Sequence, residues 1–230
     1  MTGIRQEGVC LMLKAVVFDL DGTLLDTIPD IAAAMNDALE RSGLPTHPVR
    51  DYEGFVGGGV REAVRASVPE GISPELFEQV LRGYRAYYLA HSCDHTRPYP
   101  GVETMLRTLE ERGVSLGILS NKSEDLACEI AGRLFPDVSF TCVHGRVDGR
   151  ALKPDPAAAA PVLERMDCRP EEIAYVGDSG TDMTFAVAVG MLPVAAPWGY
   201  RSREQLLACG ARLLPKDPEE LLELLLERVG

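Results

Sequence analysis

The first residues that suggest chemistry are two aspartates in the stretch AVVFDLDGTLLDT, residues 15–27. An apolar run, which we predict to be a buried strand, leads directly into Asp19. Asp21 follows two positions later, ahead of Gly22. Carboxylates held close together repel each other, and burying either one is unfavourable unless an opposite charge compensates. We therefore expect a cation beside this pair.

Further polar side chains follow other apolar runs of the chain. In a parallel sheet, ligands bind beyond the carboxyl ends of the strands, so residues at several strand ends can meet in one site. We expect four carboxylates, lysine and hydroxyl groups at one edge of the sheet. Besides the first pair, the candidates are Ser120, Asn121 and Lys122 in LSNK, Lys153 in LKPDP, and Asp178 and Asp182 in GDSGTDM.

A cluster of carboxylates is typical of a Mg²⁺ site, because this ion prefers one or two carboxylates together with waters and substrate phosphate. The metal would keep Asp19 ionised, and Asp21 could exchange a proton beside it. Gly22 allows the backbone to turn so that its N–H groups face an anion. These residues together favour phosphate chemistry.

The elements that must position these residues alternate in the C-terminal two-thirds of the chain. Short apolar runs are separated by amphipathic helical patterns, which favours a parallel sheet covered on both faces. The predicted class is α/β with a doubly wound sheet. We predict strands at 114–120, 138–143, 173–178, 192–196 and 211–215, and helices at 102–112, 123–134, 156–167, 181–189 and 217–228.

Residues 26–95 show no strand pattern and are predicted to be an inserted helical domain. One helix carries an apolar stripe of Ile31, Met35 and Leu39, and a second spans the segment after Ser73. We assign 12–25 and 96–230 to the α/β core domain. Residues 1–11 are expected to be a poorly ordered extension.

Composition narrows the classes of partner. Among 230 residues, 23 are Lys or Arg and 35 are Asp or Glu, which gives a net charge of −12. Such a chain is poorly suited to nucleic acids or anionic membranes, which attract basic residues. The six cysteines are scattered and read as reduced thiols, so the cytoplasm is the expected location. The oligomeric state is left open between monomer and homodimer.

The four motifs DLDGTLLDT, LSNK, KPDP and GDSGTDM resemble, in this order, those of the haloacid dehalogenase (HAD) phosphatase superfamily. The helical insert resembles the C1-type cap of that family, and the likeness extends from residue 12 to the end. With PYPGV at 98–102 and WGY at 198–200, the chain is most similar to phosphoglycolate phosphatases and to related sugar-phosphate or pyrophosphate phosphatases.

The resemblance implies roles for the motif residues. Asp19 would attack phosphorus, and Asp21 would act as general acid and then as general base. Lys153 and the Ser120 hydroxyl would offset charge on the transferring phosphoryl group. Mg²⁺ would be held by Asp19, the backbone carbonyl of Asp21 and Asp178, with Asp182 close by or on a metal-bound water. The implied substrate contacts are Gly22, Asn121, Lys122 and Arg61.

Several of these assignments have alternatives. Arg61 follows a glycine-rich turn and either touches substrate or is a solvated helix residue. Lys122 either holds a substrate carboxylate or pairs with Glu124 or Asp125. Asp182 can also cap the helix that follows it. Trp198 and Tyr200 either line the mouth of the pocket or pack in the core.

The expected activity is a Mg²⁺-dependent phosphatase that acts on a small phosphorylated metabolite through an aspartyl-phosphate. 2-Phosphoglycolate is the leading substrate, on the resemblance alone. The alternatives are a β-phosphoglucomutase-like mutase, a pyrophosphatase, and a non-catalytic binding protein with the same fold. The intact set of Asp19, Asp21, Lys153 and Asp178 argues against a mere binder, and Asp21 argues against the dehalogenase branch.

Overall fold

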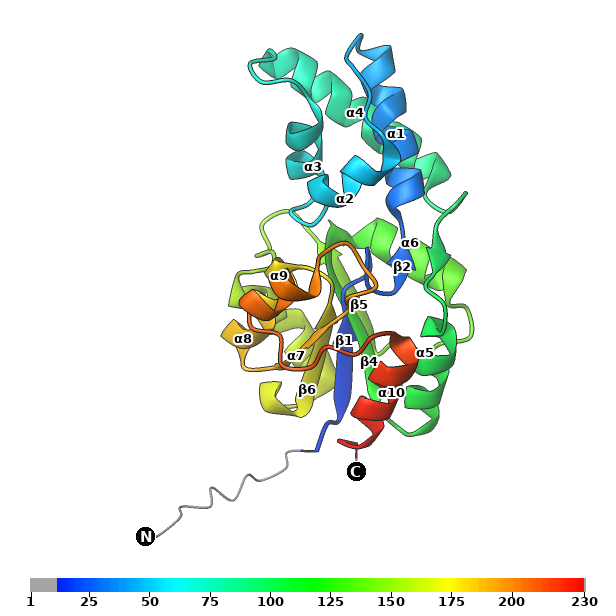
Figure 1. Cartoon of the computed structure of the whole chain (residues 1–230), viewed down its shortest axis with the longest axis vertical. Helices are drawn as coiled ribbons and strands as arrows, with labels where there is room; N and C mark the ends of the chain where they lie inside the picture. The colour runs from blue at the N-terminus through cyan, green and yellow to red at the C-terminus, as the bar shows by residue number, and fades with distance from the viewer. Residues whose placement is uncertain (1–11, 230) are drawn as a thin grey trace.

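The computed structural model describes residues 12–229 and is built around a five-stranded parallel sheet (Figure 1). The strand order is β5-β4-β1-β6-β7, with β1 in the centre. The chain therefore builds one half of the sheet and then returns to build the other, which confirms the predicted doubly wound α/β class. The strands are β1 (Ala15–Phe18), β4 (Ser115–Ser123), β5 (Cys142–Arg146), β6 (Ile173–Gly177) and β7 (Leu192–Ala195).

Helices cover both faces of the sheet. Because side chains alternate along a strand, Val16 and Phe18 pack into one core, and Ala15 and Val17 pack into the other. The first core is completed by α5 (Val102–Glu111), α6 (Glu124–Leu134) and α10 (Pro218–Leu226). The second contains α7 (Ala160–Met166) and α8 (Gly180–Val189). A 3₁₀ turn, η2 (Pro156–Ala159), leads into α7, and another, η3 (Pro170–Glu172), leads into β6. Helix α9 (Arg203–Ala208), which the sequence pattern did not predict, packs through Leu206 against α8 and β7.

The inserted segment is helical and has its own hydrophobic cluster. In Figure 1 it lies above the carboxyl ends of the sheet as a cap. The predicted stripe Ile31, Met35 and Leu39 is fully buried, and it packs against Val80 and Leu81 of the last cap helix. The elements of the cap are α1 (Ile28–Arg41), η1 (Val49–Asp51), α2 (Tyr52–Phe55), α3 (Val60–Ser67) and α4 (Pro74–His91).

The two chain crossings between core and cap lie side by side. Strand β2 (Leu25–Asp26), on the way out, pairs antiparallel with β3 (Arg97–Pro98), on the way back. Neither strand was predicted from the sequence, because two residues are too few to show an alternating pattern. The pairing fixes both connections at the base of α1.

Two predicted strands differ from the structure. The apolar run at 138–143 is mostly loop, and β5 begins only at Cys142. Val138 and Phe140 are apolar because they pack against the first core, where the Phe140 ring meets Phe135 edge to face. At 211–215 only an isolated bridge forms, between Leu213 and Val194, and Pro215 has no N–H with which to extend it.

No helix within residues 12–229 has the length and apolar character needed to span a membrane. The five cysteines of this range are free thiols. Cys10 and the extension predicted at 1–11 lie outside the described residues.

Candidate active site

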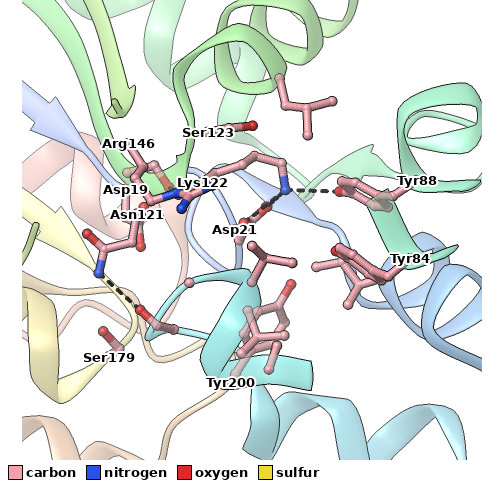
Figure 2. A pocket seen from close by; sticks show the side chains of 18 of the residues that line it. Asp19, Asp21, Tyr84, Tyr88, Asn121, Lys122, Ser123, Arg146, Ser179 and Tyr200 are labelled. Carbon is pink, nitrogen blue, oxygen red and sulfur yellow. Dashed lines mark hydrogen bonds and ion pairs between the residues drawn. The ribbon is translucent and has the colours of Figure 1, made fainter. Parts of the chain in front are cut away.

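Three neighbouring strands bring their polar ends to one cavity of about 390 Å³ beneath the cap (Figure 2). Asp19 follows β1, Asp178 follows β6, and Ser120 lies near the end of β4. All three residues line the cavity, together with Asp21, Asn121 and Lys122. The structure thus assembles most of the predicted site residues at the carboxyl edge of the sheet.

The floor of the site carries three carboxylates. One oxygen from each of Asp19, Asp178 and Asp182 lies within 4.8 Å of the others. Burial raises the pKa of Asp19 to about 6. Burial, reinforced by the charges of Asp182 and Asp19, raises the pKa of Asp178 well above its ordinary range. A set of hard oxygen ligands this crowded fits a divalent cation such as Mg²⁺.

Lys153 is the cation that the protein places in this cluster. Its Nζ lies 2.7 Å from Asp182 Oδ1 and 3.2 Å from Asp19 Oδ1, and it donates to the Tyr175 hydroxyl at 2.6 Å. Burial disfavours the charged lysine, but the two carboxylates outweigh burial and raise the pKa of Lys153 above its ordinary value. One lysine against three carboxylates leaves the cluster negative, which is a further reason to expect a metal.

Asp182 has a second task at the start of α8. Its Oδ2 accepts hydrogen bonds from the backbone N–H and the hydroxyl of Ser179, and its own N–H donates to Ser179 Oγ. This reciprocal pair is a capping box, which satisfies N–H groups at the helix start. Asp182 therefore both caps the start of α8 and contributes charge to the cluster.

Asp178 is held by groups from two loops. The Thr23 hydroxyl donates to its Oδ1 at 3.3 Å, and the Tyr200 N–H donates to its Oδ2 at 2.9 Å. Gly22 approaches so closely that a Cβ there would lie 2.3 Å from Asp178 Oδ2, and its φ of 79° also favours glycine. Gly22 thus packs directly beside the cluster of three carboxylates. Thr23 was not identified from the sequence, although it lies inside the first motif.

Asp21 is paired with Lys122, which is a finding that the sequence left open. Lys122 Nζ donates to both carboxylate oxygens of Asp21, at 2.9 and 3.0 Å, and to the Tyr88 hydroxyl of the cap at 2.9 Å. The Lys122 side chain is only 6% exposed. Neither Glu124 nor Asp125 is its partner, since Glu124 pairs instead with Arg150 at 2.6 Å. Figure 2 shows these contacts, which run from Asp21 in the core through Lys122 to Tyr88 in the cap.

The two residues before Lys122 have different surroundings. Ser120 is buried at the cavity wall, and its Oγ accepts a hydrogen bond from the Lys122 N–H at 3.3 Å. The Asn121 side-chain amide is occupied by backbone groups of Lys153 and of Gly57 in the cap. Asn121 was predicted to contact substrate; in the structure its amide joins segments of the protein.

The structure does not bring Arg61 to the cavity. Its guanidinium pairs with Glu78 at 2.7 Å and lies over the Phe77 ring, and its side chain is 48% exposed. The arginines that do line the cavity are Arg85, Arg146 and Arg201, none of which stands in a recognisable motif.

The WGY segment serves both the core and the pocket. Trp198 packs against the first core, and its Nε1 donates to the Thr23 carbonyl at 2.9 Å. Tyr200 lines the cavity, and its hydroxyl contacts the N–H and side chain of Thr27 at the foot of the cap. Most of the apolar part of the cavity wall comes from cap residues, including Val56, Val60, Ala63, Tyr84 and Tyr88, and Leu126 of α6 adds to it from the core.

Comparison with known proteins agrees with this geometry. The family model described as haloacid dehalogenase-like hydrolase matches residues 16–196. A phosphoglycolate phosphatase of Chromobacterium violaceum is 36% identical over 220 residues, covering 93% of this chain and 96% of the relative. A phosphoglycolate phosphatase of Pseudomonas putida is 32% identical over 227 residues, covering 96% and 83%.

Solved structures share the fold. A protein from Lactobacillus delbrueckii subsp. bulgaricus is 30% identical and superposes with a TM-score of 0.86, covering 93% of this chain and 98% of the other. A predicted phosphoglycolate phosphatase from Haemophilus somnus is 26% identical with a TM-score of 0.85, covering 92% and 97%. Core and cap are thus found together in these relatives.

Proposed function

This chain belongs to the haloacid dehalogenase-like hydrolase family and is a phosphatase, and on this basis we propose that its substrate is 2-phosphoglycolate. One observation carries the proposal beyond the relatives' names. The cavity holds a second buried cation, Lys122, beside Asp21 and apart from the Lys153 cluster. A small substrate with a phosphate at one end and a carboxylate at the other suits two cationic positions.

In the proposed reaction, an ionised Asp19 oxygen attacks phosphorus and the bond from phosphorus to the glycolate oxygen breaks. Asp21, which takes up a proton from solvent once Lys122 has released it, gives that proton to the leaving oxygen. Asp21 then takes a proton from water as the water oxygen attacks phosphorus, which releases phosphate and restores Asp19. Lys153, held between Asp19 and Asp182, offsets the negative charge of the phosphoryl group throughout.

We propose Mg²⁺ as the cofactor, held by Asp19, Asp178 and the backbone carbonyl of Asp21, with Asp182 acting directly or through a water. Support comes from the three carboxylates within 4.8 Å and from the raised pKa of Asp19 and Asp178, since a bound cation would relieve their repulsion. When bound, the metal would supply positive charge to the phosphoryl oxygens. Ca²⁺ should inhibit, because its larger and looser coordination disturbs in-line geometry.

Lys122 would recognise the substrate carboxylate. In the structure its ammonium is bound to Asp21 and to the Tyr88 hydroxyl, so its charge is already neutralised by one carboxylate. As Asp21 turns to the leaving oxygen, Lys122 can exchange that carboxylate for the substrate's own. Tyr88 would hold the ammonium in place during the exchange.

The test is phosphate release from a panel of substrates with Mg²⁺: 2-phosphoglycolate, pyrophosphate, hexose and pentose phosphates, nucleotides and β-glucose 1-phosphate. A kcat/KM for 2-phosphoglycolate at least about tenfold above every other member, equivalent to 1.4 kcal/mol, is expected. Comparable values across the panel would overturn the substrate assignment and keep the phosphatase. Isomerisation of β-glucose 1-phosphate without net phosphate release would instead identify a mutase.

A further inference from the structure

The loop at 56–59, which joins α2 to α3, is attached to the core at two places. Arg201, in the loop after β7, donates through its guanidinium to the carbonyls of Glu53 and Val56, the latter at 3.0 Å. Asn121, in β4, donates through Nδ2 to the carbonyl of Gly57 at 3.2 Å. The cap loop lines the cavity through Val56, Gly57 and Gly59, so these attachments lie beside the candidate active site.

Each attachment point also holds a charged group of the site. Asn121 Oδ1 accepts from the Lys153 N–H at 3.1 Å, and Nδ2 donates to the Lys153 carbonyl at 3.0 Å. The residue before Arg201 is Tyr200, whose N–H donates to Asp178 Oδ2 at 2.9 Å. The contacts that dock the cap loop are therefore continuous with those that place Lys153 and Asp178.

Asn121 is saturated by these contacts. It is 7% exposed, and its two amide hydrogens are used by the carbonyls of Lys153 and Gly57. No amide hydrogen is left to donate to a substrate. Gly57 presents its carbonyl with a φ of 125°, a conformation that glycine adopts readily and other residues rarely do.

We propose that Asn121 and Arg201 are positioning residues that couple docking of the 56–59 loop to the placement of Lys153 and Asp178. With the loop docked, Asn121 has all of its hydrogen bonds and the Lys153 backbone is held on both its N–H and its carbonyl. With the loop released, Asn121 loses a partner and the segment around Lys153 is freer to move. The kinetic part of this inference rests on the proposed function; the structural part does not.

The structural part is tested by hydrogen exchange on the substrate-free full chain. Arg201→Met keeps the apolar stem and removes the donors. Arg201 does not contact Lys153. Its replacement should nevertheless speed hydrogen exchange both in the 56–59 loop and at the Lys153 amide, by about three- to tenfold. Asn121→Ala should speed exchange in the loop to a similar degree. Exchange at Lys153 that is unchanged in Arg201→Met would overturn the coupling.

Arg203→Met is the matched control. Arg203 also donates to a backbone carbonyl, that of Leu214, but this bond stays within the core. The control should alter exchange at neither the loop nor Lys153. Arg201→Lys, which keeps a donor and the charge, should restore part of the protection, so that a folding defect in Arg201→Met does not decide the result.

The kinetic part is tested by a double-mutant cycle on kcat/KM for p-nitrophenyl phosphate. If both residues act through the docked loop, Arg201→Met combined with Asn121→Ala should lose little more than the worse single variant, and the loss should lie mainly in kcat. Losses that multiply, as expected for Arg203→Met with Asn121→Ala, would overturn a shared path. If the wild type turns over no phosphate ester, the proposed function fails and the exchange experiment still decides the coupling.

Discussion

Lys122 is the buried cation whose partner must change during the proposed reaction. It now binds both oxygens of Asp21, which lies 101 positions away in the chain. The proposed general acid thus rests in an ion pair with Lys122, whose third contact is the Tyr88 hydroxyl. A substrate that carries its own carboxylate can replace Asp21 at Lys122 and free Asp21 for proton transfer.

Replacing Lys122 with methionine should raise KM for 2-phosphoglycolate by about tenfold or more, because a buried, charge-assisted hydrogen bond is lost. KM for p-nitrophenyl phosphate, which has no carboxylate, should change by less than about threefold. Steady-state kinetics with both substrates measure the difference. Lys14→Met serves as control, because Lys14 is an exposed lysine paired with Glu172. Equal changes for both substrates would contradict carboxylate recognition by Lys122.

A site residue could be predicted from the sequence where the evidence for it lies in neighbouring residues of the chain. Asp19, Asp178 and Lys153 could be chosen from the sequence because each stands in a motif next to a predicted strand or its connecting loop. The partner of Lys122 could not be chosen from the sequence. Its ion pair with Asp21 joins the ends of two strands, and its hydrogen bond to Tyr88 reaches a cap helix. Arg61 had a suggestive glycine-rich neighbourhood, but the packing of α3 against α4 turns it to Glu78.

The cap helices are anchored where the chain crosses to and from the core. Asp30, in the first turn of α1, is 2% exposed and accepts hydrogen bonds from the returning segment. The donors are the His95 N–H, and the N–H and hydroxyl of Thr96, the latter two at 2.8 Å, and the His95 ring nitrogen Nδ1 lies 3.0 Å from Asp30 Oδ1. This carboxylate holds the two linkers together beside the β2–β3 pair.

Replacing Asp30 with asparagine should lower the free energy of unfolding by about 1 to 3 kcal/mol at neutral pH. Burial acts to raise the pKa of Asp30, but the hydrogen bonds from Thr96 and His95 outweigh it, and the pKa lies below its ordinary value of 3.8. The contribution is therefore fully present above about pH 4 and is lost as pH falls through the lower folded pKa.

Urea unfolding at several pH values measures this effect, and the gap between wild type and Asp30→Asn should narrow toward acid. Asp37→Asn is the control within the same helix, because among the described residues Asp37 pairs with Arg41 alone, at the surface. A gap that stays constant down to about pH 3 would refute an ionised, hydrogen-bonded Asp30.

The order of the main elements followed from periodicity, and the exceptions have physical causes. Apolar residues report burial and not conformation, so the run at 138–143 was predicted as a strand although Val138 and Phe140 pack from a loop. The short α9 was missed because its capping residue Ser202 and a single buried Leu206 leave little pattern.

At the scale of the whole molecule, this acidic chain gathers three carboxylates, those of Asp19, Asp178 and Asp182, in the candidate active site. The net charge is −12, and within residues 12–229 the cation that pairs with the three-carboxylate cluster is Lys153. The folded-state pKa of Asp19, about 6, and that of Asp178 both exceed the ordinary 3.8. Without metal, the folded state therefore binds more protons than the unfolded state, and this contribution lowers stability as pH rises.

Mg²⁺, the proposed cofactor, should reverse this loss by binding the ionised carboxylates of the folded state. The rise in Tm on adding Mg²⁺ to EDTA-treated protein should grow between about pH 5 and about pH 8. Asp178→Asn should raise the Tm of the metal-free protein near neutral pH and abolish most of the Mg²⁺ response. Thermal unfolding measures both, and a Mg²⁺ response that is equal in Asp178→Asn and wild type would contradict the assigned ligands.

The most direct measurement asks whether Asp19 carries the phosphoryl group. The Asp21→Asn variant is incubated with p-nitrophenyl phosphate and Mg²⁺, quenched with acid, digested and analysed by mass spectrometry. p-Nitrophenolate leaves without a proton, whereas hydrolysis of the intermediate needs Asp21 as a base, so the phosphoenzyme should accumulate. We predict one added phosphoryl group on Asp19 that is absent from Asp19→Asn/Asp21→Asn. Release of p-nitrophenolate by Asp21→Asn with Asp19 unmodified, or modification of another residue, would contradict nucleophilic attack by Asp19.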